Sequence, residues 1–349
     1  MRPNLTSKFA IIVPVFNTAL YLSECLDSVR AQNYGRFSVF LIDDGSTDES
    51  PRICDRYVEQ DDRFHVLHKR NEGVSAARNA ALELIESRMG GEYNWIICLD
   101  SDDYLSRDAL KTIAIQGGYF NPDMLLFGVR RFSKKNDQSV GKRSHTPLVL
   151  NRYDAFRFSF DQMPESKFSP AFAYFIGNIA FSAEFVFGIR FSTSLKIGED
   201  QDFKVKALSR SNRCVVISDC LYNYRLRKGS LSHSGSITTF HDLRLFCGWL
   251  DRYDDLSQVG RPVIEKRVAD LWWQCLRDAS YLGKLDCYWV ELTGVLNKMR
   301  TSFESFILRE WRWKKRCLIF SLGKWAVQMY FLKQRRRATF DKEMKDYFL

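Results

Sequence analysis

Apolar runs of strand length alternate with helical patterns along the first hundred residues. The strands that this pattern predicts are Phe9–Val15, Phe37–Ile42, Phe64–His68 and Trp95–Leu99. Between them, apolar residues recur every three or four positions, as in Tyr21–Val29. Strands that alternate with helices indicate βαβ units. We therefore expect an α/β fold with a mostly parallel, Rossmann-like sheet that carries helices on both faces.

The pattern changes along the rest of the chain. Further strands are predicted at Leu125–Val129, Val215–Ile217 and Leu221–Leu226. From about residue 240 onward, apolar residues recur with the period of a helix. This change predicts a first domain of residues 1–240 and a helical C-terminal region of residues 241–349.

Polar clusters follow three of the predicted strands. They are Pro14–Asn17, Asp43–Asp44 and Asp100–Asp103. Ligands of open α/β sheets bind beyond the carboxyl ends of the strands, so we expect these clusters to converge on one site.

The acidic cluster after the fourth strand holds Asp100, Asp102 and Asp103 in a chain whose net charge is +10. Magnesium and similar hard cations bind through one or two carboxylates plus substrate phosphates. An Asp-x-Asp pair at a strand end can place one carboxylate on a ribose hydroxyl and the other on a metal. A solvated turn whose aspartates cap the next helix fits the cluster equally well.

Two further clusters also have two interpretations each. Lys69–Asn79 places a glycine and basic residues, among them Arg78, at the start of a helix, where an anion is favoured. Gly198–Phe203 brings Asp200 to another helix start, where a carboxylate could act as a general base. Each is also an ordinary helix start with solvated or first-turn charges.

Composition narrows the classes of partner. The nine cysteines are scattered and never spaced as CxxC, which argues for a reducing compartment and against a zinc site or a disulfide framework. We expect no secretory signal and no membrane-spanning helix, because the apolar runs are too short. The positive charge points to an anionic partner, and we expect no nucleic acid because no recognition motif for it is present.

Basic residues interleave with aromatic ones in Arg309–Phe320 and continue to Lys333–Arg337. This pattern is typical of an amphipathic helix on an anionic bilayer surface. A helix packed on the first domain, with a solvated basic face, explains it equally well. We expect a cytoplasmic protein, either free or peripheral on the inner face of the cell membrane.

Taken in order, five segments resemble the inverting family-two glycosyltransferases, which have the GT-A nucleotide-sugar-binding fold. They are Ile12–Asn17, Ile42–Asp48, Asn71–Asn79, Leu99–Asp103 and Gly198–Asp200. The resemblance covers about residues 8 to 205. The stretch Tyr174–Ser194 departs from the family pattern, so the resemblance implies nothing about the acceptor pocket.

The resemblance implies a role for each cluster. The catalytic base would be Asp200, and Asp102 would bind Mn²⁺ or Mg²⁺. His233 could complete the metal shell, although an ordinary loop histidine explains it equally well. Arg225 or Arg227 could assist Arg78 at the diphosphate. The residues that would bind the nucleotide sugar are Pro14, Val15, Phe16, Asn17, Asp44, Arg78, Asp100 and Ser101.

The activity implied is metal-dependent, inverting transfer of a sugar from a nucleotide sugar, most simply a UDP-sugar, to a hydroxyl of a glycan or lipid-linked acceptor. Lipopolysaccharide, capsule or exopolysaccharide synthesis would use such a step. One alternative is a nucleotidyltransferase that makes nucleotide sugars, but its glycine-rich loop is missing from Pro14–Asn17. The other alternative is a non-catalytic sugar-nucleotide-binding membrane scaffold.

Overall fold

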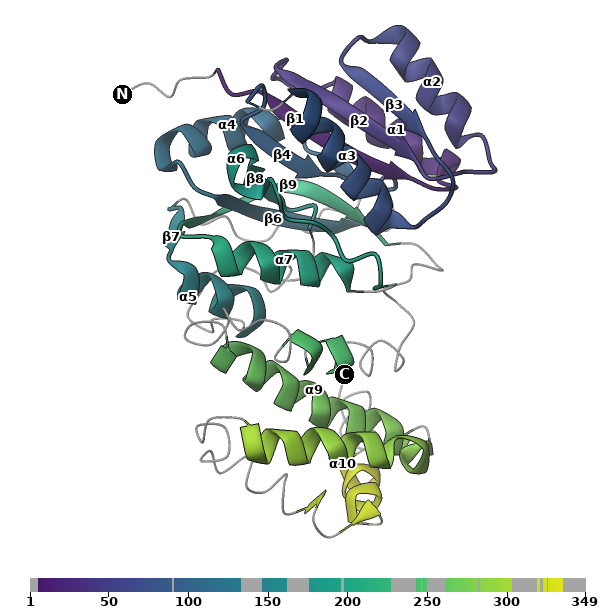
Figure 1. Ribbon diagram of the computed structural model, residues 1–349, viewed down its shortest axis with the longest axis vertical. Coiled ribbons are helices and arrows are strands. Elements are labelled where there is room, and N and C mark those ends of the chain that lie inside the picture. Colours follow the sequence, from purple (N-terminus) through teal and green to yellow (C-terminus); the bar gives the residue numbers. More distant parts are fainter. Residues whose placement is uncertain are drawn as a thin grey trace, which may run out of the picture. The chain divides into compact units, whose positions relative to one another are not determined.

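The computed structural model describes residues 6–89, 91–132, 146–161, 176–195, 198–226, 243–245, 247–249, 261–281, 283–302, 319–320, 323–324 and 326–334. The chain divides into two compact units, residues 1–228 and 229–349. Within the described residues, the first unit contains a sheet with covering helices, and the second is helical (Figure 1). The expected boundary after residue 240 falls among residues 227–242, outside the described part.

The described strands form one sheet, in the order β3-β2-β1-β4-β8-β6-β9-β5, with β7 paired to β9. Strands β1 to β4 run parallel, and β8 runs antiparallel between β4 and β6. The strands are β1 (Phe9–Val15), β2 (Phe37–Asp43), β3 (Phe64–His68), β4 (Trp95–Cys98), β5 (Tyr104–Leu105), β6 (Met124–Phe132), β7 (Leu148–Leu150), β8 (Ile179–Ser182) and β9 (Cys214–Arg225).

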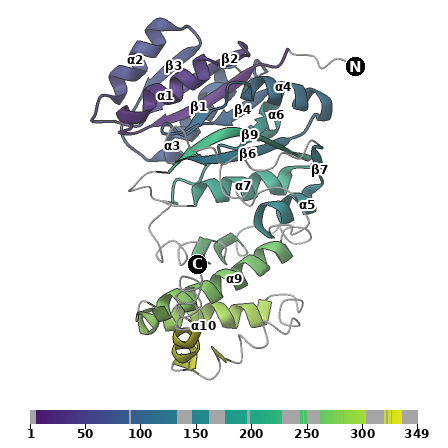
Figure 2. The ribbon, with the colours of Figure 1, turned by 180° about the vertical axis from the view of Figure 1, so that it is seen from behind.

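Helices cover both faces of this sheet, as predicted. Figure 1 draws α3 in front of the sheet, and Figure 2, seen from behind, draws α1 in front. Every residue of β1 is buried, because apolar side chains on both of its faces meet helices. The helices are α1 (Ala19–Arg30), α2 (Ser50–Gln60), α3 (Val74–Met89), α4 (Ala109–Phe120), α5 (Arg152–Phe156), α6 (Ala183–Val186) and α7 (Glu199–Arg210), and a π-helical turn, Arg157–Asp161, follows α5.

The second half of the sheet differs from the prediction. Val215–Ile217 and Leu221–Leu226 were expected to form two strands, but β9 runs through both, with register shifts against β6 on either side of Gly128. The polar residues Ser218 and Asp219 between the apolar runs occupy this bulge rather than a turn. The antiparallel strand β8 was not predicted, because its four residues carry too short a pattern.

The second unit is helical, as predicted. Helices α9 (Arg261–Tyr281) and α10 (Leu285–Ser302) are joined by a hydrogen bond of 2.8 Å from the Trp272 indole N–H to the Leu292 carbonyl. No helix among the described residues is long and apolar enough to cross a membrane. Most of the basic, aromatic segment lies outside the described residues, at 303–318 and 335–349.

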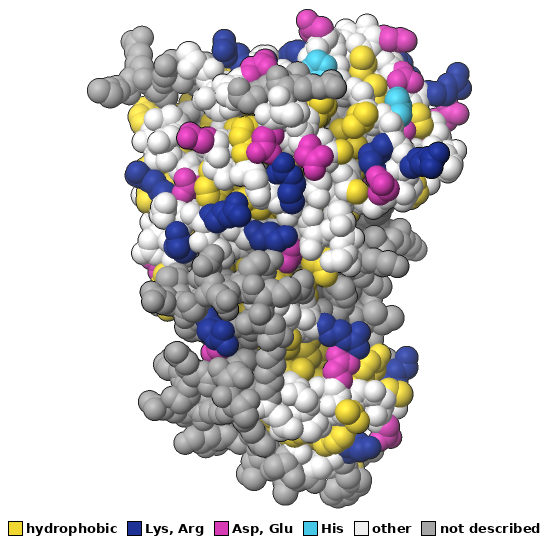
Figure 3. Space-filling view, in the orientation of Figure 1, with side chains coloured by type: hydrophobic (Ala, Val, Ile, Leu, Met, Phe, Trp, Pro, Cys, Tyr) yellow, Lys and Arg dark blue, Asp and Glu magenta, His cyan; other side chains and the backbone are white. Residues whose placement is uncertain are grey.

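Basic side chains also occupy the surface of the first unit. Figure 3 shows them gathered over α7, with acidic side chains between them. Helix α7 and the turn after it contribute Lys206, which is partly exposed, and Arg210 and Arg213, which are exposed. The positive charge of the chain is therefore not confined to its C-terminal segment.

Candidate active site

The loop after β1 is fixed to the loop after β2. Asn17 has a φ of 51°, in the left-handed region that asparagine adopts more readily than most residues. Its Oδ1 accepts a hydrogen bond of 2.8 Å from the Thr47 N–H. Phe16 beside it is 48% exposed, whereas Pro14 and Val15 are buried within β1. Of these four predicted residues, Phe16 and Asn17 therefore present side chains at the sheet edge.

Asp44 anchors the segment that leads into α3. Its buried carboxylate accepts hydrogen bonds from Lys69 Nζ at 2.8 Å, the Glu72 N–H at 3.0 Å and the Gly73 N–H at 2.7 Å. Such charge-assisted bonds are stronger than neutral ones. In this structure Asp44 holds the segment Lys69–Gly73 at the end of β2, and its role in binding the nucleotide sugar stays a prediction.

Gly45 allows the two loops to approach closely. Its φ is 73°, and a Cβ at this position would lie 2.8 Å from the backbone nitrogen of Asn71. Any other residue would combine a disfavoured conformation with a clash against backbone. Gly45 thus fixes the distance between the loop after β2 and the loop before α3.

His68 links two carboxylates on the first unit, and sequence reasoning did not single it out. Its Nδ1 lies 2.8 Å from Asp43 Oδ2, and its Nε2 lies 3.1 Å from Asp55 Oδ1. The hydrogen bond with Asp43 is the main cause that raises the His68 pKa above its ordinary value of 6.5. His68 ends β3, directly before Lys69, which binds Asp44.

We expect the His68→Gln variant to lose a pH-dependent part of the free energy of unfolding. This contribution is complete below the ordinary pKa and disappears as pH rises through the raised pKa of the folded state. The side chain is 42% exposed, so the effect is less than about 1 kcal/mol. Denaturant unfolding at about pH 5.5 and pH 8.5 measures it. His65→Gln, on the same strand, is the control, because no described carboxylate pairs with His65. Equal pH dependence in both variants would contradict the assignment.

Arg78 joins the two principal predicted clusters. Its guanidinium donates to Asp100 Oδ1 at 2.8 Å, to Asp200 Oδ1 at 2.5 Å and to Glu199 Oε1 at 3.3 Å. The side chain is 3% exposed, and its guanidinium carbon lies 5.1 Å from the centre of the Phe191 ring. Helix α3 therefore places one buried cation between the end of β4 and the start of α7. The structure brings Arg78, Asp100 and Asp200 together, although about a hundred residues separate the two aspartates.

The proton affinity of Asp200 follows from this arrangement. The pKa of the carboxyl is raised to about 7, mainly by burial; Arg78 lowers it, and Glu199 and Asp100 contribute to the rise. The pKa of Arg78 lies well above its usual range, because Asp200, Asp100 and Glu199 favour its charged form although burial opposes it. The Asp200 side chain is 24% exposed, so solvent and ligands can reach it. A carboxyl with a pKa near neutrality suits a general base.

Asp103 joins the loop of Asp100–Asp103 to β9. It thereby has a structural role, whereas Asp100 and Asp102 are predicted to bind ligands. It is 1% exposed and accepts hydrogen bonds from the Tyr222 hydroxyl at 2.6 Å and the Arg225 N–H at 2.7 Å. Burial first, then Asp100 and Asp102, raises its pKa to about 8. The ring of Tyr222 lies against Gly177, where a Cβ would come within 2.4 Å of a ring carbon.

Ser101 and Arg225 hold the loop after β4 in place through hydrogen bonds. Ser101 is 5% exposed and accepts a hydrogen bond of 3.0 Å from the Thr18 hydroxyl, so it links the ends of β1 and β4. Arg225 donates from Nε to the Asp102 carbonyl at 2.8 Å and from its terminal nitrogen to Glu24 Oε2 at 2.6 Å. Arg225 thus positions Asp102, whose side chain is partly exposed.

Some predicted residues cannot be placed. His233 and Arg227 lie outside the described residues, among 227–242. Within the described chain, no group of three or more His, Cys, Asp or Glu side chains forms a metal cage. A site that uses one or two carboxylates and takes its other ligands from substrate phosphates and water needs no such cage. Asp102 is compatible with that kind of site.

The contacts of Tyr222 and His68 could not be found from sequence spacing. Tyr222 lies 119 residues from Asp103, and only the pairing of β5 with β9 brings them together. His68 was visible as the last residue of a predicted strand, next to Lys69. Its position between Asp43 and Asp55 depends on the parallel register of β2 and β3.

Solved structures resemble this fold. Residues 1–349 of TarS from S. aureus, in complex with UDP-GlcNAc, align with a TM-score of 0.63 at 22% identity, over 84% of this chain and 81% of that one. The mannosyltransferase PcManGT from Pyrobaculum calidifontis, in complex with GDP-Man and Mn²⁺, aligns with a TM-score of 0.52 at 18% identity, over 97% and 90%. At these identities the likeness shows the fold, which is of the GT-A class.

The sequence comparisons define the family. Residues 10–181 match the sequence profile described as glycosyl transferase family 2, and this part of the chain belongs to that family. Glycosyltransferase GlyA of Streptococcus pneumoniae serotype 4 is 29% identical over 75% of this chain and 36% of its own length. The poly(ribitol-phosphate) β-N-acetylglucosaminyltransferase TarS of Staphylococcus aureus is 29% identical over 63% of this chain and 36% of its own length. The chain thus spans about a third of these two relatives.

Proposed function

We propose that the protein transfers a sugar, with inversion, from a UDP-sugar to a hydroxyl of a glycan or lipid-linked acceptor in surface-polysaccharide synthesis. The observation that carries the proposal is the contact of Arg78 with both Asp100 and Asp200. It puts a carboxylate of the Asp-x-Asp pair and a carboxyl with a pKa near 7 at one edge of the sheet. The family of residues 10–181, and the relatives that build teichoic acid and similar polymers, support the same activity.

Asp200 would take the proton in the reaction. The acceptor hydroxyl oxygen bonds to the anomeric carbon as the bond from that carbon to the diphosphate oxygen breaks, and the hydroxyl proton passes to Asp200 Oδ. Three carboxylates share one guanidinium before this step, so the proton reduces an excess of negative charge. Arg78 favours the ionised form of Asp200 and orients the carboxylate beforehand, and it retains Asp100 and Glu199 as partners afterwards.

Asp102 would hold a divalent cation together with the diphosphate of the donor. Such a cation neutralises the negative charge of the departing nucleoside diphosphate. The residues present fit this role, since Asp102 is a partly exposed carboxylate two residues from Asp100, and carboxylate oxygens are ligands of such cations. Asp103 would not bind the cation but would hold the loop against β9 through Tyr222 and Arg225.

We expect Asp102→Asn to weaken UDP binding by at least about tenfold, or about 1.4 kcal/mol, when Mn²⁺ is present. Without Mn²⁺ the variant and the native protein should bind UDP equally, because the lost carboxylate acts through the cation. Isothermal titration calorimetry with and without Mn²⁺ measures both. Asp62→Asn, at an exposed carboxylate between α2 and β3, is the matched control. Equal Mn²⁺ dependence in the two variants would remove Asp102 from the metal site.

The activity itself is tested by incubating the full chain with UDP-GlcNAc, UDP-glucose, UDP-galactose and GDP-mannose in the presence of Mn²⁺. We expect release of nucleoside diphosphate from at least one UDP-sugar. Binding of the donors without release from any of them would instead support the non-catalytic scaffold. Release of inorganic pyrophosphate from a nucleoside triphosphate and a sugar phosphate would support the nucleotidyltransferase.

A further inference from the structure

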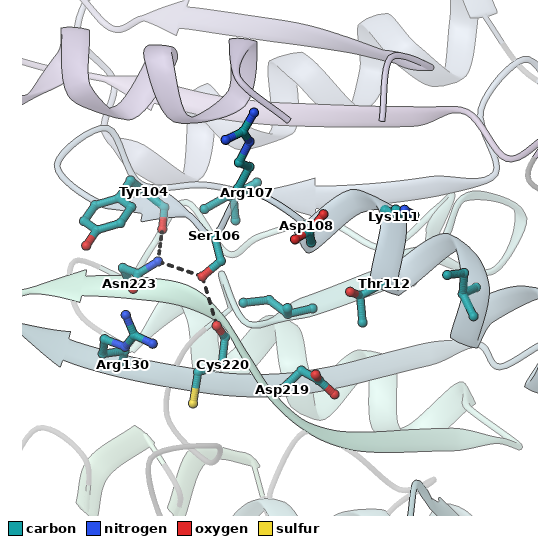
Figure 4. Close-up of a pocket in the computed structure, with 13 residues that line it drawn as sticks. Tyr104, Ser106, Arg107, Asp108, Lys111, Thr112, Arg130, Asp219, Cys220 and Asn223 are labelled. Atoms are coloured by element: carbon teal, nitrogen blue, oxygen red, sulfur yellow. Dashed lines mark hydrogen bonds between the residues drawn. The ribbon is translucent and has the colours of Figure 1, made fainter. Parts of the chain in front are cut away.

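A polar cavity lies beside the predicted active site and is not used by the mechanism above. Its volume is about 720 Å³, and its walls come from β5, the first turns of α4, β6 and the bulged part of β9. Figure 4 shows Arg130 extending from β6 toward Asn223 on β9, with Lys111 and Thr112 on α4 across the opening. We call this space the β5–α4 cavity. Its volume is in the range of small-molecule sites.

The bulge in β9 forms one wall of the cavity. The register of β6 against β9 shifts on both sides of Gly128. A Cβ at Gly128 would lie 3.0 Å from Cys220 Sγ and 3.1 Å from the Asp219 carbonyl oxygen, so glycine leaves room for the bulged strand. The bulge brings Asp219 into the cavity wall. β-bulges often redirect side chains next to binding sites.

Two buried polar groups in the cavity wall lack hydrogen-bond partners among the described residues. Asn223 is 1% exposed, and its Nδ2 donates to the Tyr104 carbonyl at 3.2 Å and to Ser106 Oγ at 3.1 Å, but its Oδ1 has no partner. The Nε of Arg130, opposite Asn223 in the strand register, is also buried without a partner. Leaving a buried polar group unpaired is destabilising. Native proteins normally satisfy such groups with water or a ligand.

The chemistry of these groups selects a class of ligand. Asn223 Oδ1 and the Asp219 carboxylate accept hydrogen bonds, so the ligand must carry donors, whereas Arg130 Nε requires an acceptor. A phosphate dianion offers acceptors only, so it could pair with Lys111 and Arg130 but not with Asn223 Oδ1 or Asp219. A hydroxyl is both donor and acceptor. The Arg107 and Asp108 side chains of the same wall carry opposite charges and both bind Asn33, so together they add no net charge.

We propose that the β5–α4 cavity binds a sugar unit through hydroxyl groups that pair with Asn223, Arg130 and Asp219. The Tyr104 ring in the same wall offers an apolar face of the kind that such ligand sites combine with a few polar groups. The assignment of this sugar to the acceptor chain rests on the proposed transferase function. The sugar site itself does not depend on that function.

The cavity is connected to the acidic loop through β5 and β9. Residues 102–106 run from the predicted metal ligand into the cavity wall without interruption. Tyr222 donates to Asp103, and the next residue, Asn223, donates to the Tyr104 carbonyl. Neighbouring residues of a strand point to opposite faces, so β9 separates the two sites while contacting both. A sugar in the cavity would therefore lie against β9, the strand whose Tyr222 and Arg225 hold the loop of Asp100–Asp103.

Saturation-transfer NMR on the full chain tests the proposal, with maltotriose, N,N′-diacetylchitobiose and ribitol as separate probes at tens of millimolar. Saturating UDP and Mn²⁺ are added to occupy the donor site. We expect at least one probe to show transfer that UDP does not abolish. Arg130→Met and Asp219→Ala should each weaken that binding by at least about fivefold. Arg52→Met, which removes an exposed arginine on α2, should leave it unchanged.

Two results would overturn the proposal. One is the absence of transfer to all three probes in the native protein, which would mean that the cavity holds only water. The other is equal binding by the cavity variants and Arg52→Met. The proposed function fails separately, if UDP does not bind or no donor is cleaved. UDP binding is measured in every variant and should stay unchanged, which also shows that the variants are folded.

Discussion

Asp200→Asn is expected to lower the rate of sugar transfer by about a hundredfold to ten-thousandfold, the usual contribution of a general base. Asparagine keeps the shape of the side chain and can still accept a hydrogen bond from Arg78, but it cannot take the proton of the acceptor. Affinity for UDP in the presence of Mn²⁺ should change little, because Asp200 is not a donor ligand in the proposed mechanism. Product formation under single-turnover conditions and UDP titration measure the two quantities separately.

The pH profile gives a second measure of the same role. The kcat/KM of the native protein should rise with pH through about 7, because the base acts only when it is deprotonated and its pKa lies there. Asp202→Asn is the matched control. Asp202 lies on the same helix, but it pairs with Lys206 at 2.8 Å and does not contact Arg78. Full transfer activity in Asp200→Asn would contradict the assignment of the base.

Arg78→Met is expected to reduce both activity and stability. Removing a buried charge that has several partners costs about 3–5 kcal/mol, because the remaining charges lose their compensation. Asp100, Glu199 and Asp200 would then face one another without a cation. The pKa of Asp200 should rise, since Arg78 lowers it, and the rising limb of the kcat/KM profile should move to higher pH. Denaturant unfolding and the pH profile measure the two effects.

A double variant separates the charge effect from loss of packing. Arg78→Met combined with Asp200→Asn removes one cation and one anion, so it should be less destabilised than Arg78→Met alone. Arg190→Met is the matched control for a partly exposed arginine, since Arg190 pairs with Glu86 and is 32% exposed. The Arg190→Met variant should lose less than about 1 kcal/mol of its free energy of unfolding. If Arg190→Met and Arg78→Met lose the same free energy of unfolding, the buried ion pairs of Arg78 stabilise the fold no more than the partly exposed ion pair of Arg190.

The sequence was informative where a short pattern decides the structure. Continuous apolar runs predicted β1 to β4, and the carboxylates that follow β2 and β4 do lie at the edge of the sheet. The helix start at Glu199 and the basic turn before α3 were also predicted, and the resemblance to a family placed Arg78 and Asp200 in one site. In the structure the two side chains meet in an ion pair.

The sequence was less informative where distant segments decide the structure. The buried oxygens of Asp44 bind the segment Lys69–Gly73, a contact that depends on how two loops pack and that sequence spacing did not reveal. The bulge in β9 was interpreted as a break between strands, because polar residues in a bulge and in a turn look alike. The unpaired groups of Asn223 and Arg130 arise from strand pairing, which no local pattern records.

The close approach of Gly45 to Asn71 has a consequence for engineering this protein. Backbone meets backbone there, and the Asp44 carboxylate bonds to main-chain N–H groups of the facing loop. The two loops therefore behave as one module, and exchanging either of them alone with a relative would separate matched partners. Phe16, which is predicted to bind the nucleotide sugar, is the safer position for changing donor preference, because its exposed side chain can be substituted without disturbing that module.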